Sequence, residues 1–269
     1  MTIDDCSTAD NSETGEGTEP TSNCANDNSI STTNIGCCAS PSFPSAFYAV
    51  VENDVRTIYS NNYPNHDFCF NPARIPEPLY NEFVLDATPE KAATISSILN
   101  NNNRPQRFFG ITLNGIVMAP SPATPFIFEN TATGEFNWDW VFEANNNQGD
   151  GRSLVSLDCA SAHSGDQGYH YHGNMFEYVE HELAGISTTT TPPAQSLHIG
   201  WANDGFPILY RFGPDASGSM KLLQPSYQLK AGERPGDGIS APCGLYNGKY
   251  INDYAVSYTH LTLPTIYSV

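Results

Sequence analysis

The segment 158–172 constrains the fold more than any other part of this 269-residue chain. It ends in the run Tyr-His-Tyr-His, and the five residues before that run, Ser-Gly-Asp-Gln-Gly, are turn formers. Successive side chains of an extended strand point to opposite faces, so His170 and His172 share one face and the two tyrosines share the other. The turn formers predict a β-hairpin, which returns His163 opposite either His170 or His172.

Three histidines on one face of a hairpin predict a metal site. Facing residues of an antiparallel pair lie about 4.5–5.5 Å apart at Cβ, which lets the imidazoles of His163, His170 and His172 converge on one ion. Imidazole suits copper and zinc, and three histidines with an open position are typical of a catalytic zinc site. A nearby sulfur or tyrosine would favour copper, and a closing carboxylate would favour zinc. In the alternative interpretation, the strand is simply packed on both sides, with imidazoles bonded to backbone carbonyls.

Other residues extend this candidate site. His66, beside an aspartate, is a candidate fourth ligand or a loop-capping residue. Asp204 and Asp158 are candidates for carboxylates that accept a ligand N–H and so fix its tautomer, although Asp204 also suits a plain Asp-Gly turn. His198 is a further candidate, whereas His181 between two glutamates is expected on the surface.

The hairpin motif, preceded by an Asp-Cys and an Ala-His, resembles the YHYH domain family. Four further blocks resemble segments of the same family. These blocks are Ser60–Asp67 with its Pro-Asn-His-Asp core, Gly110–Ile116 with Leu-Asn-Gly, Ile199–Ile208 with Asp-Gly-Phe-Pro-Ile, and Tyr246–Tyr254. The five blocks run in order from Ser60 to Tyr254. The family is named for its motif, so the resemblance implies no particular activity.

A second resemblance points to a different fold. His170-x-His172 followed by Glu177 looks like the first metal motif of the cupins. However, Ser164 replaces the leading glycine of that motif, Glu177 falls where a helix is expected, and no downstream Pro-x-Gly and His segment follows. A cupin is therefore the runner-up fold.

Charge and cysteine content narrow the possible partners and compartment. The formal net charge is -18, with 11 Lys+Arg against 29 Asp+Glu, which argues against nucleic acid and anionic membranes as partners. No apolar run reaches the roughly 20 residues of a membrane helix, and no signal peptide is visible. Seven scattered cysteines favour extracytoplasmic disulfides, in a secreted, periplasmic or cell-surface protein. Cys159 is either a soft copper ligand or a disulfide partner of Cys69 or Cys243.

The chain divides into three parts. Residues 1–45 contain no Lys or Arg and predict a disordered acidic leader rich in Ser, Thr and Asn. Residues 46–256 predict a YHYH-type domain, truncated at its C-terminus. Residues 257–269, with His260, resemble the translated read-through of a sequencing adapter and are expected to be a non-native tail.

The domain is expected to be mainly β, either a β-sandwich or a mixed β-rich domain, with a few short helices and long loops. Strands are expected at 47–51, at 108–117 around an Asn-Gly turn, and at 136–142. Short helices are expected from Thr88 through Leu99 and from Asn174 to Gly185.

Three functions remain open from the sequence. The first is the binding of one copper or zinc ion by the histidine cluster. The second is a metal-dependent hydrolase or oxidase, in which an open coordination position activates water or oxygen and Asp204 or His66 serves as the base. The third is a surface or adhesion module that binds a protein or a glycan without a metal.

Overall fold

The computed structural model of this protein describes residues 38–69, 75–94, 108–119, 122–127, 136–144, 157–158, 160–165, 167–173, 175, 178–179, 192–225, 227–238 and 240–256. The expected tail and most of the expected leader lie outside these residues, as do His181 and Cys159. The described part is mainly β, as the sequence predicted. Within it, no helix has the length and apolar character required to cross a bilayer.

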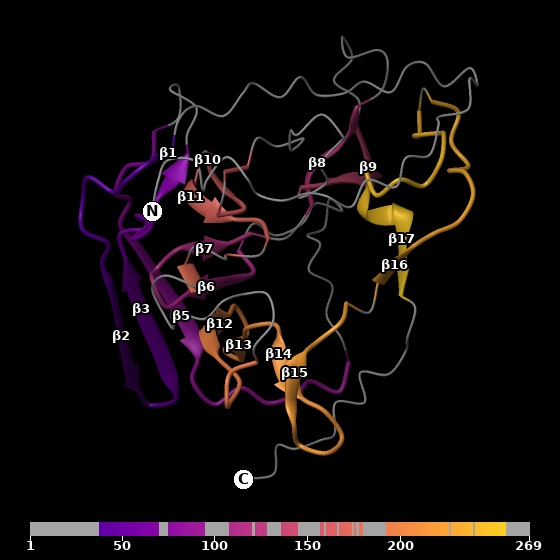
Figure 1. The fold of residues 1–269 in the computed structure, drawn as a ribbon. Coiled ribbons are helices and arrows are strands. Elements are labelled where there is room, and N and C mark those ends of the chain that lie inside the picture. The colour runs from indigo at the N-terminus through magenta and orange to yellow at the C-terminus, as the bar shows by residue number, and fades with distance from the viewer. Residues whose placement is uncertain are drawn as a thin grey trace.

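The largest sheet carries the histidine hairpin at one edge. Its strands, in spatial order, are β10 (Ala162–Gly165), β11 (Gly168–Tyr171), β7 (Val117–Met118), β6 (Gly110–Thr112), β12 (His198–Ala202) and β13 (Pro207–Leu209). They descend in that order through the left half of Figure 1. β11 and β7 are parallel, and every other neighbouring pair in this sheet is antiparallel.

The predicted strand, Asn-Gly turn and second strand form β6, a turn at 113–115, and β7. Gly115 has φ of +83°, and a Cβ at this position would lie 2.5 Å from Oγ of Ser60. Only glycine therefore meets both the backbone conformation and the close approach. Oγ1 of Thr112 accepts the N–H of Ile116 at 3.1 Å, which closes the same turn.

A three-stranded antiparallel sheet flanks the central one. It consists of β2 (Phe47–Glu52), β3 (Val55–Ser60) and β5 (Asn81–Asp86), in that order. In the β2–β3 turn, Asn53 and Asp54 have φ of +49° and +62°, the paired positive values of a two-residue hairpin turn. Ile58 and Leu85 of this sheet pack against Ile111 of β6 in one buried cluster.

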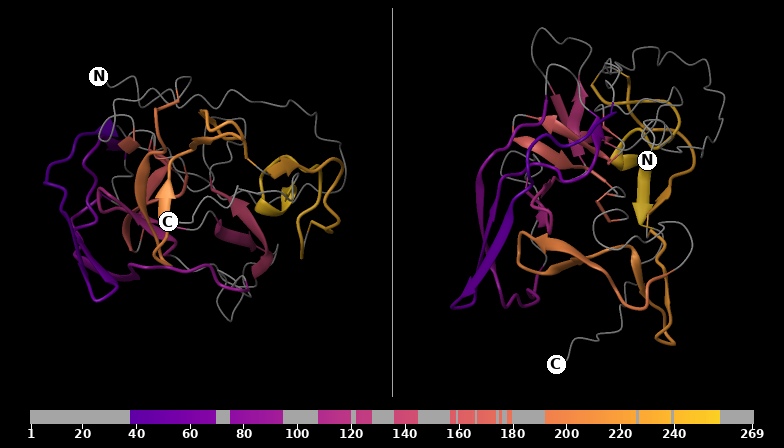
Figure 2. Two further views of the ribbon diagram at one scale, coloured as in Figure 1. Left: turned by 90° about the horizontal axis from the view of Figure 1, so that it is seen from below. Right: turned by 60° about the vertical axis from the view of Figure 1, so that its left-hand side comes forward.

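Short two-stranded ribbons complete the fold. They are β1 (Cys38–Ala39) with β4 (Phe68–Cys69), β8 (Pro122–Ile127) with β9 (Phe136–Glu143), β14 (Phe212–Pro214) with β15 (Met220–Leu222), and β16 (Tyr227–Leu229) with β17 (Tyr254–Val256). A 3₁₀ helix, η4 (Ile251–Asp253), precedes β17. Figure 2 shows the β2–β3 hairpin on one side of the molecule and the β16–β17 ribbon on the other.

The main core lies beneath the histidine hairpin. It includes Tyr169 and Tyr171 of β11 together with Tyr63, Phe68 and Ile116, all of them buried. A second cluster of Phe126, Phe142 and Tyr250 joins the β8–β9 ribbon to the C-terminal segment. The tyrosine face of β11 is therefore part of the interior, and its histidine face is directed the other way.

The structure describes the first part of one expected helix and only a few residues of the other. In the first, residues 89–94 are described and contain no helical turn. In the second, the Val179 N–H donates to the carbonyl of Met175 at 3.0 Å, which is one helical turn, and both residues are buried. The described sheets are open, and Glu177 lies outside the described residues, so the structure lends the cupin alternative no support.

Candidate metal centre

The hairpin register decides which histidines face each other. In the β10–β11 pair, His163 lies directly opposite His170, and Gly165 lies opposite Gly168 across a two-residue connection. The N–H of His172 donates to the carbonyl of Ser161 at 2.8 Å, so the ladder continues past β11 and holds His172 in line with the other two. Of the two registers that the sequence allowed, the structure has the one that pairs His163 with His170.

The three imidazoles converge. The ligand nitrogens of His163, His170 and His172 all lie within 4.8 Å of one another. Their ring centroids are 4.7 Å apart for His163 and His170, 5.0 Å for His163 and His172, and 4.8 Å for His170 and His172. His172 is buried, and the other two are half-buried. The cluster is thus partly shielded from solvent.

The spacing of the nitrogens fits a first-row metal ion. Nε2 of His163 and Nε2 of His172 are 3.1 Å apart. With metal–nitrogen bonds of about 2.0–2.1 Å, two ligands are separated by about 3.3 Å in a tetrahedral site and by about 2.9 Å at a right angle. The observed separation lies between these values. At this distance a proton on either Nε2 can be shared with the other, and an ion held by both atoms would require both lone pairs.

The tautomer of His170 is set by the backbone. Its Nδ1 lies 2.9 Å from the carbonyl oxygen of Gly168, so Nδ1 is the donor and Nε2 keeps its lone pair. Such a backbone partner commonly orients a metal-binding histidine. Gly165 leaves room for this ring, because a Cβ on Gly165 would lie 2.9 Å from Cε1 of His170.

The opposite face of the hairpin has its own polar partners, and these include two predicted site residues. Oδ2 of Asp158 accepts the hydroxyl proton of Tyr169 at 2.6 Å, while Oδ1 accepts the backbone N–H of Ala160 at 2.9 Å. Nε2 of His66 lies 2.5 Å from the hydroxyl of Tyr171. His66 and Asp158 therefore lie under the tyrosine face, and the structure does not bring them into the cluster. The alternation of β11 that groups the histidines also separates them from these two residues.

Asp204 and His198 lie at the far end of the central sheet. Asp204 is exposed in the β12–β13 turn, where Oδ1 is 3.4 Å from the N–H of Phe206. This arrangement matches the turn interpretation. Nε2 of His198 donates to the carbonyl of Gly200 at 2.8 Å, and its ring meets Trp201 edge-on at 4.4 Å. Burial lowers the pKa of His198, the Gly200 carbonyl opposes that change, and the charge of Arg56 reinforces it.

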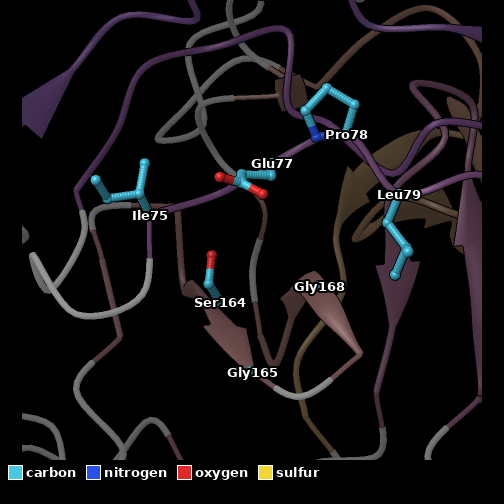
Figure 3. A pocket seen from close by; sticks show the side chains of 7 residues that line it. All are labelled: Ile75, Glu77, Pro78, Leu79, Ser164, Gly165 and Gly168. Carbon is cyan, nitrogen blue, oxygen red and sulfur yellow. The ribbon is translucent and has the colours of Figure 1, made fainter.

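A pocket beside the cluster was not foreseen from the sequence. Its volume is about 300 Å³, and it lies between the segment 75–79 and the tip of the β10–β11 hairpin (Figure 3). Glu77 and Ser164 supply its polar side chains. The two segments are far apart in the chain, and nothing in the local pattern of either one indicates that they meet.

One cysteine supports the expected disulfides. Cys243 is disulfide-bonded, with a partner that is not among the described side chains. The backbone register of β1 and β4 also places Cys38 opposite Cys69. Cys159 lies outside the described residues, so its pairing stays a prediction.

This protein is a β-rich domain that carries a histidine cluster on one face of a hairpin. The family model described as "YHYH protein" matches residues 82–264, which is more than half of the chain, and the chain belongs to this family. The Tyr-His-Tyr-His run lies inside the match, whereas the block with His66 lies before it. No curated protein and no solved structure matches the chain.

Proposed function

We propose that this YHYH protein binds one transition-metal ion, copper or zinc, through His163, His170 and His172. The observation that carries the proposal is the mutual approach of three imidazole nitrogens to within 4.8 Å on one hairpin face. Three imidazoles that lie close together and are buried or half-buried form an arrangement that a shared cation stabilises. A formal charge of -18 further raises the local concentration of cations.

The donor set leaves the choice between the two metals to experiment. Three neutral imidazoles bind Cu²⁺ more tightly than Zn²⁺ according to the general order of divalent affinities. Among the described residues, the group that converges contains no carboxylate and no thiolate. Tyr169 and Tyr171 are buried on the other face of β11. The fourth coordination position is therefore available to water or to an exogenous ligand.

An enzymatic role is the second candidate, and the adjacent pocket favours it. A bound ion with an open position supplies Lewis acidity or an activated water. The chain contributes the orientation of His170 through Gly168, the partial exclusion of water by the buried His172, and a neighbouring cavity of about 300 Å³. Tyr169 and Phe206, which would block turnover if they filled the site, lie in the core and in the exposed β12–β13 turn respectively.

The metal-free adhesion module is less well supported. That hypothesis predicts histidines that are exposed and dispersed, whereas three of them converge on one hairpin. The extracytoplasmic location remains part of the proposal. It is supported by the disulfide of Cys243, because structural disulfides persist mainly in oxidising compartments.

Calorimetric titration of the metal-free protein with Zn²⁺ and, separately, with Cu²⁺ tests this function. We expect one site per chain for at least one of the two ions. His163→Ala should weaken that site by at least about 100-fold, since even the loss of an outer hydrogen-bond partner costs 10–100-fold. His198→Gln, which changes an imidazole outside the cluster, should leave the affinity unchanged. Equal losses in the two variants would contradict the proposal.

A further inference from the structure

The pocket beside the hairpin has a defined chemical character. Its lining consists of Ile75, Glu77, Pro78, Leu79, Ser164, Gly165 and Gly168. In Figure 3 the carboxylate of Glu77 lies among the other lining residues, and the hydroxyl of Ser164 points towards it from the hairpin. Among these lining residues Glu77 is the charged one, Ser164 carries a hydroxyl, and the remaining side chains are apolar or absent.

Ser164 offers an unused hydrogen-bonding group. Its Oγ is buried, and no partner for it lies within hydrogen-bond distance among the described residues. A buried polar atom without a partner costs free energy. A ligand that supplies a hydrogen bond to Ser164 therefore recovers this cost when it binds.

The two glycines keep the pocket open. A Cβ on Gly168 would lie 2.7 Å from Nδ2 of Asn62 and 3.4 Å from Cδ2 of Leu79, and Gly168 has φ of +83°. A Cβ on Gly165 would press against the ring of His170. No larger residue fits at either position without displacing the hairpin or the segment above it. The pocket thus depends on the same hairpin tip that sets the position of His170.

We propose that this pocket binds a small organic ammonium compound with an apolar body. The ammonium group pairs with the carboxylate of Glu77, a polar group of the ligand reaches Ser164, and the body contacts Ile75 and Leu79. An anion is disfavoured by Glu77 and by the overall charge of -18. This inference rests on the proposed function in one respect. Ser164 directly follows His163 in β10, so the ligand would lie next to the proposed metal site.

The test uses the full chain without added metal and benzylamine as the probe, followed by NMR of the backbone amides. We expect saturable shifts at Gly165 and Gly168. Benzyl alcohol, which has the same ring and no charge, should bind about fivefold more weakly, which corresponds to about 1 kcal/mol. No saturable shift, or equal binding of the two compounds, would overturn the proposal.

Two variants test whether Glu77 attracts the ammonium group. Glu77→Gln should weaken the binding of benzylamine about fivefold. Glu82→Gln, which removes a different exposed carboxylate that lies on β5, should not weaken it. Equal effects of the two variants would show general electrostatic attraction and would also overturn the proposal. Zn²⁺ and Cu²⁺ titrations of the parent chain report the metal site separately. Absence of benzylamine binding to the parent, with intact metal binding, removes only this inference, and the reverse result removes only the proposed function.

Discussion

The hydroxyl of Tyr171 and Nε2 of His66 are 2.5 Å apart, beneath the strand that carries His170 and His172 on its other face. Nδ1 of His66 lies 2.7 Å from the carbonyl oxygen of Asp67, so Nδ1 is the donor and Nε2 accepts the proton of Tyr171. Nδ2 of Asn114 donates to the same hydroxyl at 3.0 Å. The tyrosine between the two histidines is thus held by two polar partners in the core.

Tyr171→Phe is expected to destabilise the fold. The change removes the hydroxyl that donates a hydrogen bond to the buried Nε2 of His66. The loss of such a partner costs about 1–3 kcal/mol. Urea unfolding measures this difference. Tyr80→Phe is the matched control, because Tyr80 is 81% exposed, and it should change the free energy of unfolding by less than about 0.5 kcal/mol. Equal stability of the two variants would show that the contact contributes nothing.

Gly165→Ala separates metal affinity from stability. The new methyl group would lie 2.9 Å from Cε1 of His170, so we expect the ring to move and the metal affinity to fall by at least about tenfold. Gly218→Ala is the control, since Gly218 has φ of +84° and no neighbour within 4 Å of its Cβ. It should lower stability through backbone strain and leave metal affinity unchanged. The idea fails if Gly165→Ala binds Zn²⁺ and Cu²⁺ as the parent does.

His198 should make stability depend on pH. Burial holds its pKa below the ordinary value of 6.5, so between the two values the unfolded chain binds more protons than the folded one. The free energy of unfolding therefore falls as the pH decreases through about 6.5 towards the lower folded pKa. His198→Gln removes this contribution. Denaturant unfolding from pH 7.5 to 5.5 should give a shallower pH dependence for the variant, and parallel curves would contradict the assignment.

The buried ion pair of Arg234 and Asp253 should dominate the stability of the C-terminal segment. The two side chains are 2% and 0% exposed and lie 2.8 Å apart, and Oδ2 of Asp253 also accepts the N–H of Gly248. Arg234→Gln leaves a buried carboxylate without its cation, which costs about 3–5 kcal/mol.

Lys221→Gln is the comparison for that pair. Lys221 lies 3.8 Å from Asp215 with 58% of its side chain exposed, and an exposed pair is worth at most about 1 kcal/mol. Thermal unfolding of the two variants should therefore differ widely. Similar melting temperatures for both would mean that the buried pair adds no more than the exposed one.

The hairpin and its cluster were predictable because their signals are local. Period-two alternation fixes which residues of 169–172 share a face, and turn formers limit the register to two choices. The strand, Asn-Gly turn and strand at 110–118 follow from the same kind of pattern. The mainly β class is confirmed on these grounds.

The partners of the hairpin could not be predicted, because they depend on contacts between distant segments. His66 contacts Tyr171 although the two residues are 105 positions apart in the sequence. The motif around His66 suggested a metal ligand, but it does not indicate which face of the hairpin His66 approaches. Glu77 reaches the pocket in the same way. Asp158 is close in sequence, but its carboxylate is used by Tyr169 and the adjacent backbone N–H groups.

Elemental analysis of the purified protein tests the central claim most directly. The parent chain and a His170→Ala/His172→Ala double variant are compared after loading with copper or zinc and removal of unbound ions. The account predicts close to one equivalent of metal in the parent and loss of that metal in the double variant. No bound metal in the parent, or equal metal in both proteins, would contradict it.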